Sequence, residues 1–232
     1  MRVIEIFHSL QGEGTLVGVP SVFVRFAGCP FRCYWCDTTY AWDYSAGEDL
    51  GLERIIDRIA RCECRFIVLT GGEPMVGPDL SPRAGLADLT HRLRALGKHV
   101  TIETAGVACI PDLACDLMSI SPKLGNAKWS GEIPVGGREV RGSDRDAVSQ
   151  LTAAYPCQLK FVVESPDDIS EIRALIERIG PLEPERVLLM PQARTREELL
   201  ARSPMVARLC EETGWRFCDR LHIRIWGSER GR

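Results

Sequence analysis

The sequence has 232 residues, is 45% hydrophobic and carries a formal net charge of −3 at pH 7. Such a chain can bury a substantial core, and its charge argues against a nucleic-acid-binding surface, which needs clustered Lys and Arg. Ten cysteines without a secretory leader or a membrane-length apolar run favour the reducing cytoplasm over a secreted disulfide scaffold or a membrane protein. We therefore expect one domain, residues 1–232, that acts on a small molecule.

The first predicted element is a strand over Arg2–Phe7, which leads into the polar, glycine-rich segment His8–Gly14. The run Gln11-Gly12-Glu13-Gly14 within it can place backbone groups and a carboxylate beside a ligand. The same composition fits an ordinary turn in which the glycines supply positive φ and Glu13 is solvated.

Three cysteines with the spacing C-x3-C-x2-C, namely Cys29, Cys33 and Cys36, follow the apolar run Pro20–Gly28. Thiolates at such spacing hold zinc or an iron–sulfur cluster. Three thiolates leave one iron of a [4Fe–4S] cluster open to a small molecule such as S-adenosylmethionine (SAM), whereas structural zinc needs four ligands. The alternatives are thiols packed as small hydrophobes and a zinc ribbon completed by Cys62-Glu63-Cys64.

The rest of the chain alternates between apolar strands and amphipathic helices, which predicts an α/β fold with mostly parallel strands. The expected helices are 52–60, 86–95, 167–179 and 196–212, and the expected strands are 65–70, 98–104, 116–121, 158–164 and 186–190. Ser165 is expected to cap the helix that follows it, and Thr195–Glu198 has the pattern of a capping box. Pro204 can kink or split the last helix. The stretch 125–146, rich in glycine and charge, is expected to be a loop.

The cysteine triplet and two further segments each stand at the carboxyl end of a predicted strand. These segments are Thr70-Gly71-Gly72-Glu73-Pro74 and Ile102-Glu103-Thr104. Carboxyl ends of parallel strands form the ligand-binding edge of α/β sheets and barrels, and adjacent glycines let a ligand approach the backbone. A plain turn also fits the first segment, and a solvated carboxylate also fits Glu103.

The cysteine motif, with an aromatic residue before its last cysteine, resembles the signature of the radical SAM superfamily. A narrower resemblance, to the 7-carboxy-7-deazaguanine synthases, runs from end to end of the chain. Its motifs are Phe7–Gly14, Arg25, Cys36–Thr38, Ser121–Lys123 and Arg220–Gly227. The resemblance implies a shortened, partial βα barrel of the radical SAM type.

What the resemblance implies for activity is a ring contraction in the queuosine and deazapurine pathway. 6-Carboxy-5,6,7,8-tetrahydropterin becomes 7-carboxy-7-deazaguanine with loss of ammonia. The implied cofactors are a [4Fe–4S] cluster, SAM and Mg²⁺. The implied partners are a flavodoxin- or ferredoxin-like reductant and, as in other members, a second copy in a homodimer.

Carried over residue by residue, the resemblance assigns the pterin to Leu10, Gln11, Gly12, Glu13, Arg25, Thr70 and His222. A carboxylate such as Glu13 can accept from the guanidine-like edge of a pterin, and Arg25 can pair with its carboxylate. SAM is assigned to Trp35, Cys36, Asp37, Gly72, Glu73, Ser121, Pro122, Lys123 and Gln192. The candidate catalytic residues are Glu13, Arg25, Glu103 and His222.

Thr38 is assigned to Mg²⁺, although a neutral hydroxyl is a weak ligand unless waters and the substrate carboxylate complete the octahedron. A turn hydroxyl at Thr38, an ordinary histidine at His222 and a loop amide at Gln192 are the alternatives to these assignments. For the whole protein the alternatives are a glycyl-radical activase and a non-enzymatic iron–sulfur carrier or zinc-binding module. The segment Gln11–Gly14 and the tail around His222 favour the pterin enzyme.

Overall fold

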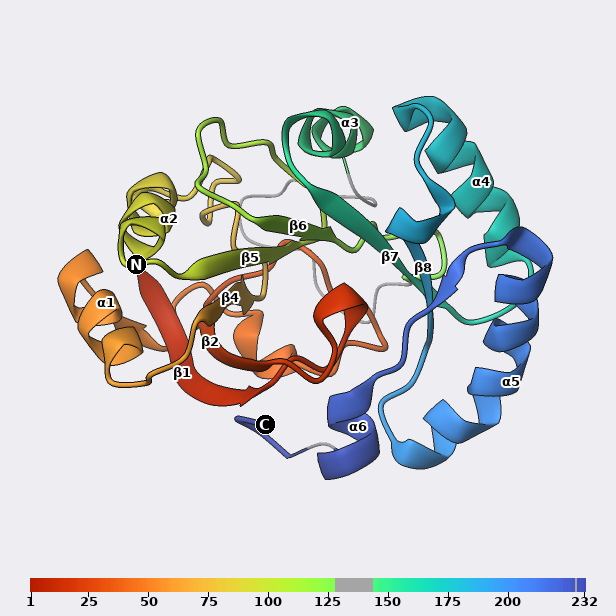
Figure 1. Ribbon diagram of the computed structural model, residues 1–232, viewed down its shortest axis with the longest axis horizontal. Helices are drawn as coiled ribbons and strands as arrows, with labels where there is room; N and C mark the ends of the chain where they lie inside the picture. The colour runs from red at the N-terminus through yellow and green to blue at the C-terminus, as the bar shows by residue number, and fades with distance from the viewer. Residues whose placement is uncertain (128–143, 228) are drawn as a thin grey trace.

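The computed structural model describes residues 1–127, 144–227 and 229–232, and its strands form one nine-stranded sheet (Figure 1). The strands are β1 (Arg2–Leu10), β2 (Pro20–Phe26), β3 (Glu48–Asp49), β4 (Phe66–Gly71), β5 (His99–Thr104), β6 (Leu117–Ile120), β7 (Cys157–Val163), β8 (Val187–Pro191) and β9 (Arg216–Phe217). Their order is β3-β1-β2-β4-β5-β6-β7-β8-β9. β1 runs antiparallel to β2 and β3, and the other neighbours are parallel. The sheet curves without closing, which confirms the expected partial βα barrel.

Most of the helices lie around the outside of the curved sheet, and the last one lies at its open side (Figure 1). They are α1 (Leu52–Ala60), α2 (Leu86–Ala95), α3 (Arg145–Ala154), α4 (Asp168–Ile179), α5 (Arg196–Thr213) and α6 (Leu221–Trp226), with short 3-10 turns at Gly14–Leu16, Thr39–Ala41 and Pro184–Arg186. Helix α1 shows why they pack there: Ile55 and Ile59, four residues apart, are both buried against the sheet. Among the described residues, none of the helices has the length and apolar character that crossing a membrane would require.

One detail of the helix boundaries was predicted correctly. The capping box at the start of α5 is present, with the Glu198 N–H donating to Thr195 Oγ1 at 3.2 Å and the Thr195 N–H donating to the Glu198 carboxylate at 3.3 Å. Pro204 lies within α5 and does not split it, because the helix continues to Thr213. A kink at Pro204 stays a prediction. The proline removes the amide that would bond to the carbonyl of Leu200, and because Leu200 lies on the exposed side of the helix, water can replace that bond.

Three details differ from the expectation. Ser165 does not cap α4: the carboxylate of Asp168 accepts the N–H groups of Glu164 and Ser165, at 2.7 and 3.1 Å. Helix α3 was not predicted, and it begins inside the stretch expected to be a loop, because Asp144 caps it through the N–H groups of its first turn. Most of that stretch, residues 128–143, lies outside the described residues.

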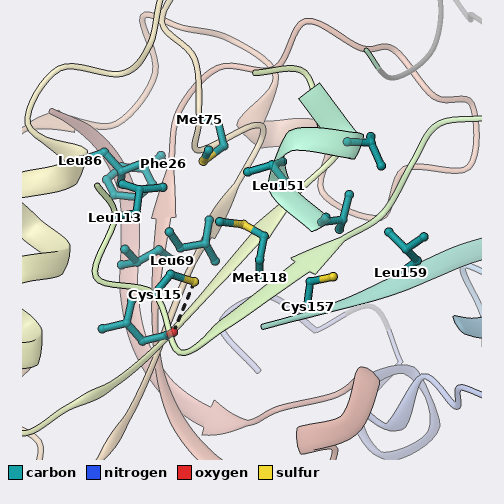
Figure 2. Close-up of a cluster of buried hydrophobic side chains, with 14 of the residues drawn as sticks. Phe26, Leu69, Met75, Leu86, Leu113, Cys115, Met118, Leu151, Cys157 and Leu159 are labelled. Atoms are coloured by element: carbon teal, nitrogen blue, oxygen red, sulfur yellow. Dashed lines mark hydrogen bonds between the residues drawn. The ribbon is translucent and has the colours of Figure 1, made fainter. Parts of the chain in front are cut away.

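The main hydrophobic core fills the space between the sheet and the helices, and Figure 2 shows Phe26, Leu69, Met118 and Leu159 within it, from four different strands. Strand β7 is buried along its whole length, as a central parallel strand should be. Its side chains alternate between faces: Leu159 and Phe161 belong to the main core, whereas Lys160 and Val162 face the opposite side. This alternation places a lysine on the inner face of the partial barrel.

Candidate active site

A cavity of about 220 Å³ lies at the carboxyl edge of the sheet, inside the curve of the partial barrel. Most of the predicted site residues line it: Leu10, Gln11, Gly12, Glu13, Arg25, Cys29, Cys33, Trp35, Cys36, Asp37, Thr38, Thr70, Gly72, Glu103, Ser121, Lys123 and His222. Glu73, Pro122 and Gln192 are buried beside it without forming its wall. The structure thus brings together segments that are up to about 200 residues apart in sequence, as expected for parallel strands.

One end of the cavity holds the three thiols of the cysteine motif. Cys29 and Cys33 are buried and Cys36 is half-buried, and they pack in an apolar cluster with Phe31 and Trp35. Burial raises the pKa of all three thiols, that of Cys36 to about 11. A metal displaces such protons when it binds, and three neighbouring thiols on one cavity wall match the donor set of a cluster with one open iron.

Cys62 and Cys64 lie at the opposite edge of the sheet. The Cys64 thiol donates to the carbonyl of Pro20, the first residue of β2, at 3.0 Å, whereas Cys29 follows the last residue of that strand. A seven-residue strand spans about 20 Å. Cys62 and Cys64 therefore cannot complete a zinc site with the cysteine triplet, and the zinc-ribbon alternative is wrong.

The Gly71-Gly72-Glu73 turn is packed tightly onto the start of the cysteine loop. The Glu73 N–H donates to the carbonyl of Gly28 at 2.8 Å, and a Cβ at Gly72 would lie 2.2 Å from the same oxygen. The buried Glu73 carboxylate accepts from Thr104 Oγ1 and from the N–H of Ala105, both at 2.7 Å, and burial raises its pKa. The side chain of Glu73 therefore holds the turn against the end of β5. The turn lines the cavity with the backbone of Gly71 and Gly72.

The other end of the cavity is a network of buried charges centred on Glu13. Lys160 Nζ lies 2.8 Å from Glu13 Oε2, and Arg220 Nε lies 3.1 Å from Glu13 Oε1. Burial alone would raise the pKa of Glu13, but the charges of Lys160 and then Arg220 lower it to about 2. The carboxylate is therefore ionised and can only accept hydrogen bonds.

Glu103 enters the same network from the end of β5. Thr70 Oγ1 donates to its Oε2 at 2.9 Å, and Gln11 Nε2 and Lys160 Nζ lie 3.2 and 3.4 Å from its Oε1. Three donors from different strands and loops thus hold the carboxylate in one orientation. This geometry does not fit a freely solvated strand-end carboxylate, which was the alternative for Glu103.

Lys160 and Arg220 had no assigned role in the sequence, although both are buried in the cavity wall. Arg220 stood within the tail motif that carried the resemblance. The signal for Lys160 was local: Gln158 and Lys160 are polar residues two apart in an otherwise apolar strand, which places both on one face. Buried lysines are rarely unpaired, so this spacing predicts an acidic partner.

Arg25 lines the cavity from β2, where it pairs in register with Thr70 of β4. Its Nε donates to Glu5 Oε1 at 2.8 Å, and Tyr40 Oη donates to the same oxygen at 2.8 Å. The guanidinium lies 5.7 Å from the ring centre of Phe7, which supports it from one side. The ion pair with Glu5 fixes the stem of Arg25 while the side chain still lines the cavity.

Asp37 and His222 join the two ends of the cavity. Arg220 is hydrogen-bonded to Asp37, and His222 Nε2 lies 3.6 Å from Asp37 and 4.0 Å from Glu13. Burial would raise the pKa of Asp37, but Arg220 holds it well below its usual range. Glu13, Asp37 and His222 have the spacing of a metal site, yet Arg220 already bonds to both carboxylates, so the trio forms an ion-pair network.

Thr38 and the predicted SAM residues lie beside the thiols. The Thr38 hydroxyl donates to Asp37 Oδ1 at 2.7 Å, and Lys123 Nζ lies 3.0 Å from Ser121 Oγ and 5.3 Å from the ring centre of Trp35. In the described part of the chain, Trp35 Nε1 is buried without a hydrogen-bond partner. Because Trp35 lines the cavity, this orphaned donor fits a site that binds a ligand with an acceptor.

Gln192 is buried behind this wall. Its N–H donates to the carbonyl of Val163 at 2.9 Å, and within the described residues its side-chain Oε1 has no hydrogen-bond partner. Its role as a SAM contact stays a prediction.

Comparisons with known proteins agree with this geometry. Residues 23–125 match the family profile of the Radical SAM superfamily. A 7-carboxy-7-deazaguanine synthase of Pyrobaculum aerophilum is 39% identical over all of this chain and 97% of its own length, and one of Rhodopirellula baltica is 37% identical over all of this chain and 88% of its own. The crystal structure of QueE from Escherichia coli matches 95% of this chain and 94% of that chain, with a TM-score of 0.68 and 25% identity.

The partial barrel, its three-thiol loop and the profile match define a radical SAM protein. The relatives that are similar over their whole length narrow this class further. The chain belongs to the 7-carboxy-7-deazaguanine synthase family.

Proposed function

We propose that this enzyme converts 6-carboxy-5,6,7,8-tetrahydropterin to 7-carboxy-7-deazaguanine with loss of ammonia, in queuosine and deazapurine biosynthesis. One observation carries the proposal: two fixed carboxylates, Glu13 and Glu103, line the same cavity as the three-thiol loop. The thiols suit radical chemistry, and the carboxylates suit a ligand with several N–H donors. Family membership also favours this activity over that of a glycyl-radical activase, or of an electron carrier.

The pterin is held by acceptors at one edge and by a cation at the other. Each carboxylate oxygen has more than one acceptor site, so Glu13 and Glu103 can bind the guanidine-like edge of the pterin while keeping their protein partners. Arg25 carries the charge and planar fork that pair with the substrate carboxylate. His222, beside Glu13, is a further polar group that can donate to the ring.

Cys29, Cys33 and Cys36 would hold the [4Fe–4S] cluster. The SAM site would comprise the Gly72 backbone together with Trp35, Cys36, Asp37, Ser121 and Lys123, with Glu73, Pro122 and Gln192 supporting it from behind. When bound, the reduced cluster and SAM supply an organic radical that abstracts a hydrogen atom. The apolar packing of the thiols by Phe31 and Trp35 restricts the access of water to that chemistry.

Mg²⁺ would bind at Thr38 and complete its coordination with water and the substrate carboxylate. What supports this is the position of the Thr38 hydroxyl in the cavity wall, next to an ionised Asp37. Its donor set is sparse, so metal and substrate should bind together.

The wider setting that we propose follows from this chemistry. A low-potential cluster needs a one-electron donor such as a flavodoxin or ferredoxin, and the free thiols of all ten cysteines suit the cytoplasm. One continuous sheet from β3 to β9 supports a single domain over residues 1–232. A homodimer is proposed on the family resemblance alone.

Turnover by the anaerobically reconstituted enzyme tests the proposal. With reductant, SAM and 6-carboxytetrahydropterin, mass spectrometry should detect 7-carboxy-7-deazaguanine. Because the conversion involves no net redox change, limiting SAM should support many product molecules. Absence of the deazaguanine would contradict the proposed activity, and stoichiometric loss of SAM would contradict its catalytic use.

A further inference from the structure

Lys160 is the most enclosed charged group of the cavity. The alternation of β7 turns it inward, and its side chain is only 3% exposed. Its Nζ lies 2.8 Å from Glu13 Oε2 and 3.4 Å from Glu103 Oε1. A single ammonium group therefore contacts both carboxylates that face the proposed pterin site.

These two carboxylates are themselves poorly solvated. The side chain of Glu13 is 16% exposed and that of Glu103 is 22% exposed. Two buried carboxylates that share a site cannot both stay ionised unless a cation lies between them, and without it one takes up a proton. A protonated carboxyl group becomes a donor, which would oppose an N–H group of the ligand.

The other groups around Lys160 do not replace it. Arg220 pairs with Glu13 and Asp37, and His222 lies 4.0 Å from Glu13. Cys218 is a buried thiol whose Sγ accepts the N–H of Gly14. On the other side, Gln11 and Thr70 give Glu103 neutral hydrogen bonds. Within the described residues, the salt bridge that Glu103 makes is the one to Lys160.

We propose that Lys160 is a positioning residue that keeps Glu13 and Glu103 ionised at the same time, so that both present acceptors to the ligand. The identity of that ligand as a pterin rests on the proposed function. The effect on the two carboxylates does not, because it depends only on the packing around β7.

The first test is ligand affinity against pH. In anaerobically reconstituted Lys160→Met, a variant of similar length without the charge, the dissociation constant for 6-carboxytetrahydropterin should rise about tenfold or more near pH 6.5 and recover toward pH 8.5, because base removes the extra proton. The wild type should stay flat. Lys98→Met is the matched control, since Lys98 donates to the carbonyl of Cys64 at the far edge of the sheet. A pH-independent loss of affinity in Lys160→Met would overturn the proposal.

The second test needs no substrate and so separates this inference from the proposed function. A carboxyl group whose pKa in the folded state is raised stabilises the protein below its unfolded pKa, and this stability is lost as pH rises through the folded pKa. The melting temperature of Lys160→Met should therefore fall relative to wild type as pH rises from the unfolded pKa, about 4.3, through the raised folded pKa, and should level off above it. Adding Glu103→Gln should remove this dependence and restore folding if the single variant does not fold. A double variant that behaves like Lys160→Met would contradict the inference.

Discussion

Cysteines lie at both edges of the sheet, and we propose different roles for the two groups. At the carboxyl edge, Cys29, Cys33 and Cys36 line the cavity. At the amino edge, the Cys64 thiol donates to the carbonyl of Pro20 at 3.0 Å and the Cys115 thiol to that of Val100 at 3.7 Å, the contact that Figure 2 marks within the core. Burial is similar in both groups. What separates the proposed metal ligands from the packing cysteines is access to a shared cavity.

The largest effect should be on cluster binding, when the cysteines at each edge are replaced by alanine. Cys29→Ala, Cys33→Ala or Cys36→Ala should each abolish cluster binding. Only three thiolates would hold the cluster, and each variant leaves two. The Cys62→Ala/Cys64→Ala double variant should keep it. Iron and sulfide analysis of the anaerobically purified proteins measures cluster binding. Loss of iron from the double variant would contradict the proposed difference between the two groups of cysteines.

Two glycines allow a second comparison, between a residue of the cavity wall and one that does not line the cavity. A Cβ at Gly12 would lie 2.2 Å from Nδ1 of His222, whereas a Cβ at Gly51, at the start of α1, meets nothing within 4 Å. Gly12→Ala should therefore displace His222 and reduce kcat/KM for the pterin about 100-fold, as misplacement of an active-site group by about 1 Å can. Gly51→Ala should leave kcat/KM within about twofold, since it touches no site residue. Equal losses in the two variants would refute the role of this close approach.

Thr38 tests the metal assignment with a smaller expected effect. Thr38→Ala removes the oxygen that we propose as a Mg²⁺ ligand, while water and the substrate carboxylate would still bind the ion. The Mg²⁺ concentration for half-maximal activity should therefore rise about tenfold. Iron content and the cluster spectrum should not change. The same Mg²⁺ activation curve in wild type and variant would show that Thr38 is not a ligand.

The smallest effect concerns stability and contrasts Glu13 with Glu73. The pKa of Glu13 is lowered to about 2, so its contribution is present above the unfolded value near 4.5 and is lost as pH falls toward 2. This contribution is at most about 3 kcal/mol. Urea unfolding of the iron-free chain should show that loss in wild type and not in Glu13→Gln.

Glu73 provides the control for that measurement. Burial raises its pKa, so its contribution has the opposite sign and is lost as pH rises. Glu73→Gln should therefore keep the acid-induced loss that wild type shows. A loss of stability between pH 5 and 2 that is the same in wild type and Glu13→Gln would contradict the ion-pair account.

The fold class and the cysteine loop could be predicted because the βα alternation and the cysteine spacing are local patterns, whereas most of the other residues of the cavity wall were implied by the family resemblance. The hydrogen bonds of the Glu73 carboxylate with Thr104 and Ala105 could not be predicted from the sequence, because these partners come from a neighbouring strand and the residue after it. The charged network was missed for the same reason: Lys160 lies 147 residues from Glu13 in sequence. Helix α3 was missed because the glycine-rich stretch before it dominated the pattern.

The most direct test of the account is a crystal structure of the reconstituted enzyme, grown without oxygen, with SAM and 6-carboxytetrahydropterin bound. The central claim is that one cavity has two ends with separate roles. We expect the cluster on Cys29, Cys33 and Cys36, and the guanidine-like edge of the pterin against Glu13 and Glu103. A fourth protein ligand on the cluster, or a pterin bound away from both carboxylates, would contradict the claim.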